Sequence, residues 1–197
     1  MRLRSKPVLC NYYVTYRCNA KCSFCDIWER PSPYITLEDV EQNLRDLKRL
    51  GVQVIDFTGG EPLLHRQLDQ MLDMAHGMGF ITTLTTNAML YPKLASRLKG
   101  KVDMLHFSLD SAHKEEHDKG RGVACYDFVM ESIKVAKQLG ERPDILFTVF
   151  RHNLHQLEEV YQNIILPNKL VLILNPAFEY NQVETGEQLT AEELQYL

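Results

Sequence analysis

Short runs of β-branched and aromatic residues alternate with longer stretches in which apolar residues recur every three or four positions. The first pattern predicts strands and the second predicts amphipathic helices. The predicted strands are 8–16, 52–58, 80–85, 104–109, 145–150 and 170–174. The predicted helices are 37–47, 68–75, 91–99, 129–139 and 157–164. Thr36 and Asp39 resemble a capping box at the start of the first helix, and Gly51 and Gly140 suit helix ends.

Strands that alternate with helices form βα units, whose right-handed crossovers make neighbouring strands parallel. Six such strands fit either an open doubly wound sheet or an incomplete barrel. We predict the second α/β arrangement, a partial (β/α)6 TIM-like barrel with a parallel sheet and outer helices, as one core domain over residues 1–197. Because a helix start at Thr190–Glu193 lies just before Leu197, we expect this core to be truncated at its C-terminus and a further domain to follow.

Composition narrows the choice of partners and compartment. The chain carries 22 Lys and Arg against 26 Asp and Glu, a formal net charge of -4, which is not typical of a nucleic-acid or membrane surface. We therefore expect a small-molecule or peptide substrate and no nucleic-acid or membrane partner. No run approaches the roughly 20 apolar residues of a membrane span. In the cytoplasmic location that we expect, grouped cysteines are metal ligands before they are disulfides.

Three of the five cysteines, Cys18, Cys22 and Cys25, form a C-x3-C-x2-C motif directly after the first predicted strand. Three thiolates can hold a [4Fe–4S] cluster and leave one iron without a protein ligand, the open position typical of a catalytic metal site. The spacing alone also fits a structural zinc site, an iron–sulfur electron carrier or other metal-binding module, or unrelated core cysteines. Cys10 and Cys125 stand apart, and we expect them to be small buried residues.

Polar residues follow the next predicted strands. Because chemistry in βα folds lies at the carboxyl ends of the strands, these residues should share one rim. The second strand ends in the segment from Thr58 to Pro62, where Gly59 and Gly60 can admit a ligand close to the backbone and Glu61 can accept from an ammonium group. The third and fourth strands end in Thr-Thr-Asn (85–87) and Ser-Leu-Asp (108–110).

The motif Cys-Asn-Ala-Lys-Cys-Ser-Phe-Cys (18–25) resembles the cluster loop of radical S-adenosylmethionine (radical SAM) enzymes, and Gly-Gly-Glu-Pro one βα unit later resembles the family's next motif. The resemblance extends from about Val8 to Asn175. The pattern is most similar to the group that contains the molybdenum-cofactor cyclase and the SPASM-type peptide-modifying enzymes. Those proteins carry further cysteines downstream, whereas this chain has none after Cys125.

The resemblance implies that Cys18, Cys22 and Cys25 hold a [4Fe–4S] cluster that cleaves S-adenosylmethionine to methionine and a 5′-deoxyadenosyl radical. The radical would take hydrogen from an organic or peptide substrate, and reduced flavodoxin or ferredoxin would supply the electron. The residues implied in cofactor binding are Phe24 near the adenine, Gly59, Gly60, Glu61 and Pro62 at the amino group, Thr86, Asn87, Ser108 and Asp110 at the rim, Arg121 at the methionyl carboxylate, and Asn153 near the adenosine.

A second motif points to different chemistry. His113-Lys-Glu-Glu-His117 matches H-x-x-E-H, a pattern of zinc peptidases, in which both histidines share one helix face. We expect this segment to be a connection after the fourth strand, since it runs into Gly120 and Gly122, and a zinc hydrolase is therefore the weaker alternative. In such a connection Arg121 would be either a carboxylate ligand or an ordinary exposed arginine.

Overall fold

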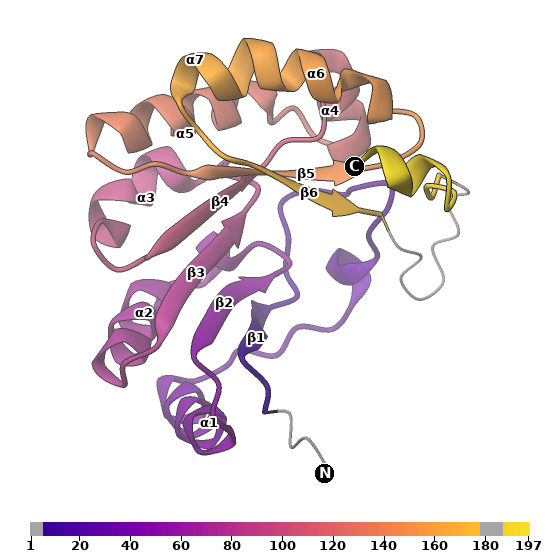
Figure 1. Cartoon of the computed structure of the whole chain (residues 1–197). Coiled ribbons are helices and arrows are strands. Elements are labelled where there is room, and N and C mark those ends of the chain that lie inside the picture. Colours follow the sequence, from indigo (N-terminus) through magenta and orange to yellow (C-terminus); the bar gives the residue numbers. More distant parts are fainter. Residues whose placement is uncertain (1–5, 178–186) are drawn as a thin grey trace.

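The computed structural model describes residues 6–177 and 187–197. Six parallel strands form one sheet in the order β1-β2-β3-β4-β5-β6. The strands are β1 (Leu9–Thr15), β2 (Val54–Gly59), β3 (Ile81–Thr86), β4 (Met104–Ser108), β5 (Asp144–Val149) and β6 (Leu172–Pro176). A doubly wound sheet would reverse its order part-way, whereas this order never does. The sheet therefore curls as a partial barrel, which confirms the predicted fold class (Figure 1).

The helices connect successive strands and lie on the convex side of the sheet (Figure 1). They are α1 (Leu37–Leu50), α2 (Leu68–Gly77), α3 (Tyr91–Leu98), α4 (Lys114–Arg121), α5 (Tyr126–Gln138), α6 (Leu157–Val160) and α7 (Leu166–Asn168), with a π-helical stretch (Tyr161–Ile165) between the last two. Short 3-10 turns cover Ile27–Glu29, Pro62–Leu64, Leu154–Gln156 and Glu193–Tyr196. The predicted capping box is confirmed, because Thr36 Oγ1 accepts from the Asp39 backbone and Gly51 ends α1 with φ of 92°.

The expectation that residues 113–122 form a plain connection was wrong. Residues 114–121 of this segment form α4, and Gly122 caps its C-terminal end in a left-handed conformation. Its buried face carries His117 and Arg121 in place of apolar side chains. Hydrophobic spacing could not reveal such a helix, since neither buried residue counts as apolar.

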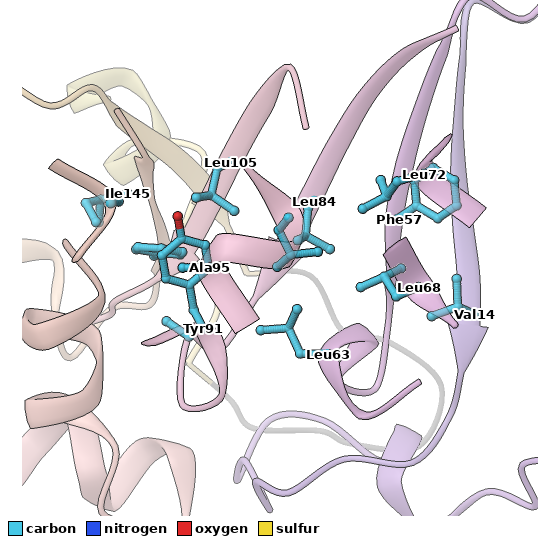
Figure 2. Close-up of a cluster of buried hydrophobic side chains, with 14 of the residues drawn as sticks. Val14, Phe57, Leu63, Leu68, Leu72, Leu84, Tyr91, Ala95, Leu105 and Ile145 are labelled. Carbon is cyan, nitrogen blue, oxygen red and sulfur yellow. The ribbon is translucent and has the colours of Figure 1, made fainter. Parts of the chain in front are cut away.

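The apolar core fills the space between the sheet and the outer helices, as Figure 2 shows. Strand residues Phe57, Leu84 and Ile145 are fully buried there. Tyr91 of α3 is also fully buried, packs edge-on to Phe107 and donates its hydroxyl to Glu141. Burial of these apolar side chains stabilises the curled sheet, by roughly 25 cal/mol for each Å² of apolar surface removed from water.

The opposite, concave face of the sheet carries polar side chains. Asp56 of β2 accepts hydrogen bonds from Thr83 and Thr85 of β3, and Thr85 Oγ1 lies 3.3 Å from His106 Nδ1 on β4. His106 Nε2 in turn lies 3.7 Å from a carboxylate oxygen of Asp144 on β5. Because residues alternate between the two faces of a strand, the same strands can bury one set and present the other to the barrel interior.

Residues 187–197 lie beside the end of β5. The backbone N–H of Arg151 donates to the Glu187 carbonyl, and its side chain lies 3.3 Å from Glu193. Thr190 and Glu193 exchange hydrogen bonds as a capping pair, so the predicted helix start is present, although a 3-10 turn follows it.

Candidate functional site

The three motif cysteines border one cavity of about 150 Å³ at the carboxyl ends of the strands. All three are free thiols and half-buried. The cavity brings together seven of the other predicted site residues, namely Phe24, Gly59, Gly60, Thr86, Asn87, Ser108 and Arg121. Because these residues come from the ends of β2, β3 and β4, from the loop after β1 and from α4, the fold gathers them where the sequence predicted one rim.

The end of β2 holds the cysteine loop from one side. The backbone N–H groups of Gly60 and Glu61 donate to the carbonyls of Thr15 and Arg17, both at 2.8 Å. A Cβ at Gly59 would lie 2.2 Å from the Thr15 oxygen, and one at Gly60 would lie 2.2 Å from the Arg17 oxygen. The sequence assigned these glycines to close approach of a ligand. The structure shows that both glycines admit the chain's own backbone at close range. Their contact with a ligand stays a prediction.

The C-terminal end of α4 holds the same loop from the other side, which sequence reasoning missed. The N–H groups of Lys21 and Ser23 donate to the carbonyls of Arg121 and Gly120 at 3.1 and 3.0 Å. Gly122 adopts φ of 64°, and a Cβ there would lie 2.3 Å from the Lys21 oxygen. The pair Gly120-x-Gly122 was the available signal, because a left-handed glycine ends a helix and permits close backbone contact.

Glu61 is completely buried at the start of the Pro62–Leu64 turn. One carboxylate oxygen accepts from Leu63 N at 3.0 Å and from Thr86 Oγ1 at 2.6 Å, and the other accepts from Asn87 N at 2.8 Å. Burial raises the pKa of Glu61 to about 7, while these donors oppose the rise. Glu61 thus ties the end of β2 to the end of β3. Its predicted contact with an ammonium group stays a prediction.

Arg121 is buried rather than an exposed loop arginine, with 7% of its surface accessible. One terminal nitrogen lies 2.6 Å from Asp110 Oδ2. The two charges form a close ion pair without hydrogen-bond alignment, and the Arg121 Nε has no hydrogen-bond partner among the described residues. The guanidinium also lies 5.5 Å from the centre of the Phe24 ring. A buried cation therefore stands at the wall of the cysteine cavity.

The remaining predicted residues hold the rim together. Asn153 Oδ1 accepts from Phe150 N at 2.7 Å, and its Nδ2 donates to the carbonyls of Asp110 and Thr148 at 3.0 and 2.9 Å. Asn87 Nδ2 donates to Asn19 in the cysteine loop at 2.8 Å. Asn153 makes three of the four hydrogen bonds that a side-chain amide can form, and these bonds join the end of β4 to the end of β5.

A second, larger cavity of about 670 Å³ lies beside the cysteine cavity, and Phe24 borders both. Asp110, His117, Phe150 and Asn153 are among its other lining residues. The rings of Phe24 and Phe150 lie 4.9 Å apart at a tilt of 49°. Its volume is in the range of small-molecule pockets, and its aromatic wall suits a flat ring system.

The two histidines of the zinc-peptidase pattern have separate partners. His113 pairs with Glu159 at 3.0 Å. His117 is buried, accepts from Asp110 N at 3.2 Å and lies 3.3 Å from Cys125 Sγ. Cys125 is buried beside it, as expected. Within residues 6–177 and 187–197, no three His, Cys, Asp or Glu side chains are grouped so that they could hold a single metal ion.

Comparison with known proteins decides among these chemistries. The family model of the Radical SAM superfamily matches residues 12–164, well over half of the chain. The chain belongs to the radical SAM superfamily. It is 35% identical over 162 residues to a probable GTP 3′,8-cyclase of Saccharolobus islandicus, a match that covers 80% of this chain and 52% of that protein. The chain thus spans about half the length of the curated relatives it matches.

Solved structures agree with this assignment. Streptococcus suis SuiB bound to its precursor peptide SuiA has a TM-score of 0.77 and 26% identity, covering 86% of this chain and 39% of SuiB. SuiB bound to S-adenosylmethionine has a TM-score of 0.78 and 24% identity, covering 98% and 47%, which shows the shared fold. The relatives also agree with the predicted grouping of cyclases and peptide-modifying enzymes. No helix among the described residues is long and apolar enough to cross a membrane.

Membership in the radical SAM superfamily implies S-adenosylmethionine and an iron–sulfur cluster. The site fits both. Three thiols are the soft ligands that iron–sulfur clusters take, and in a cubane each thiolate binds its own iron, so the three need only border a common cavity. The buried, unpartnered Arg121 Nε at this cavity is a donor suited to a negatively charged group.

Proposed function

We propose that Cys18, Cys22 and Cys25 hold a [4Fe–4S] cluster and that the neighbouring rim binds S-adenosylmethionine. When bound, the cluster would supply the electron that cleaves S-adenosylmethionine to methionine and a 5′-deoxyadenosyl radical, which abstracts hydrogen from a substrate. The observation that carries the proposal is the common cavity of the three free thiols, bordered by the glycines of β2 and by Arg121. Three thiolates leave one iron for the cofactor.

The chain's own residues would orient the cofactor. Thr86, Asn87 and Ser108 present hydroxyl and amide groups at the cysteine cavity, and Arg121 offers a cation to the methionyl carboxylate. Phe24, which borders both cavities, would pack against the adenine, with Asn153 and Asp110 in the larger cavity near the adenosine. Glu61 and Pro62 would act mainly by fixing the rim, because both are buried and Glu61 accepts three internal hydrogen bonds.

The substrate class and the electron donor are parts of the same proposal. We propose a small organic molecule or a peptide as substrate, since the relatives include GTP 3′,8-cyclases and SuiB with its precursor peptide. A reduced flavodoxin or ferredoxin would deliver the electron. Residues 1–197 would act as one core unit, which the six-stranded sheet of the described residues supports.

Anaerobic reconstitution tests the proposal. The chain should take up about four irons with matching sulfide, and with dithionite and S-adenosylmethionine it should form 5′-deoxyadenosine, read by chromatography. Cys22→Ala should lose most of the iron and all of the product. Cys10→Ala is the matched control, because Cys10 is a half-buried thiol on β1 outside the cavity, and it should behave as the wild type. Equal iron in Cys22→Ala, or zinc in place of iron, would contradict the proposal.

A further inference from the structure

Cys22 differs from the other two motif cysteines, because the residues on both sides of it form backbone hydrogen bonds with α4. Lys21 donates its N–H to the Arg121 carbonyl, and Ser23 donates to the Gly120 carbonyl. The residue that supplies one of these carbonyls also turns its guanidinium toward the cysteine cavity. Two backbone hydrogen bonds therefore fix the position of the Arg121 backbone relative to that of Cys22.

The counter-charge of Arg121 is fixed as well. Asp110 Oδ2 lies 2.6 Å from the guanidinium. Asp110 Oδ1 accepts from Thr148 N at 2.9 Å, and the Asp110 backbone N–H donates to His117 Nδ1 at 3.2 Å. Both members of the pair are buried, with side-chain exposures of 9% and 10%. Burial keeps their fields from being screened by solvent.

Cys22 and Arg121 line the same cavity, and Asp110 lies directly behind the guanidinium at 2.6 Å. The charges of Arg121 and Asp110 therefore both act on the wall that carries the Cys22 sulfur. A group that changes charge at this sulfur will feel the same two fields, since the interaction depends on position and local dielectric rather than on the kind of charge. A cluster gains one negative charge when it is reduced, so a nearby cation favours the reduced form and a nearby anion disfavours it.

We propose that the buried Asp110–Arg121 pair sets the electron affinity of the cluster through Cys22, with Arg121 favouring reduction and Asp110 moderating it. This inference rests on the proposed function, because it needs the cluster on Cys22. It assigns Arg121 a role that is present before S-adenosylmethionine binds. Arg121 and Asp110 therefore act on the reduction of the cluster through their charges. Any contact of Arg121 with the cofactor carboxylate would be an additional role.

The test is an anaerobic redox titration of the reconstituted protein without S-adenosylmethionine, with the reduced cluster quantified by electron paramagnetic resonance. Arg121→Gln should lower the ratio of reduced to oxidised cluster about tenfold at a fixed solution potential, about 59 mV for a one-electron couple. Asp110→Asn should raise that ratio. Arg121→Lys keeps the charge and should stay near the wild type.

Arg97→Gln is the matched control, because it removes an exposed arginine paired with Asp69 at 2.8 Å and should leave the ratio unchanged. Shifts of opposite sign in Arg121→Gln and Asp110→Asn support the proposal, since loosened packing would move both in one direction. Shifts of the same sign, or none, overturn it. If Arg121→Gln does not load, Asp110→Asn decides alone: a cluster no easier to reduce than the wild type overturns it. Failure of the wild type to take up iron would refute the proposed function instead.

Discussion

Gly60→Ala asks whether the end of β2 holds the cysteine loop in place. The new Cβ would lie 2.2 Å from the Arg17 carbonyl oxygen and 2.6 Å from that of Tyr16. Carbon and oxygen in even a close C–H···O contact stay about 3.3 Å apart, so the loop must move by about 1 Å. That movement strains the packing by about 1–3 kcal/mol and weakens the bonds from Gly60 and Glu61 to the loop, each about 1 kcal/mol. We expect a total loss of about 3–5 kcal/mol.

Urea unfolding followed by circular dichroism measures this loss, and iron uptake after anaerobic reconstitution measures the displacement of the cysteines. Gly77→Ala is the control, because Gly77 lies at the end of α2 and a Cβ there meets nothing within 4 Å. Gly77→Ala should leave the free energy of unfolding unchanged or raise it by up to about 1 kcal/mol. If the free energy of unfolding of Gly60→Ala lies within about 0.5 kcal/mol of the wild-type value and the variant takes up as much iron, then the loop does not depend on this contact and the reasoning is wrong.

Two further predictions concern the fold. Thr36→Ala removes the capping box of α1 and should cost about 1 kcal/mol in urea unfolding, whereas an unchanged midpoint would show that the box is not needed. Burial raises the pKa of Glu61 from 4.5 to about 7, so its stabilisation is full below pH 4.5 and is lost as the pH rises through 7. Burial lowers the pKa of His117 from 6.5 to about 4, so its contribution is full above pH 6.5 and is lost as the pH falls through 4. Between pH 4.5 and 6.5, Glu61→Gln should therefore lose stability on acidification and His117→Asn should gain it, and parallel slopes in urea unfolding would contradict the assignment.

All six strands and most helices could be predicted from the sequence, because their apolar residues repeat with the period of the element that buries them. The cysteine loop and the rim after β2 could also be predicted from the sequence, since the cysteines and the Gly-Gly-Glu-Pro segment are adjacent in sequence to strand ends. The structure brought these segments to one cavity as predicted.

Helix α4 could not be found in the same way, because its buried positions are His117 and Arg121 and its other residues are charged or glycine. The role of the glycines was also out of reach. A Gly-Gly pair indicates close approach, but only the fold shows that the carbonyls of Thr15 and Arg17 approach these glycines. Likewise, the sequence marked Glu61 as a polar rim residue, but only the fold shows that it is completely buried and accepts hydrogen bonds from Thr86 and Asn87 at the end of β3.

The cysteine loop lies between the end of β2 and the C-terminal end of α4, and the backbone hydrogen bonds on these two sides run in opposite directions. The carbonyls of Thr15 at the end of β1 and of Arg17 in the loop accept from the β2 side, and the N–H groups of Lys21 and Ser23 in the loop donate to the α4 side. These backbone hydrogen bonds orient the loop within the fold. The two sides also carry different charges. The Glu61 carboxylate on the β2 side acts on Cys18, and the Arg121 guanidinium on the α4 side acts on Cys22. Backbone contacts and charges can consequently be changed separately: a glycine variant on either side should alter how much iron the loop takes up, whereas a charge variant should alter how readily the loaded cluster accepts an electron.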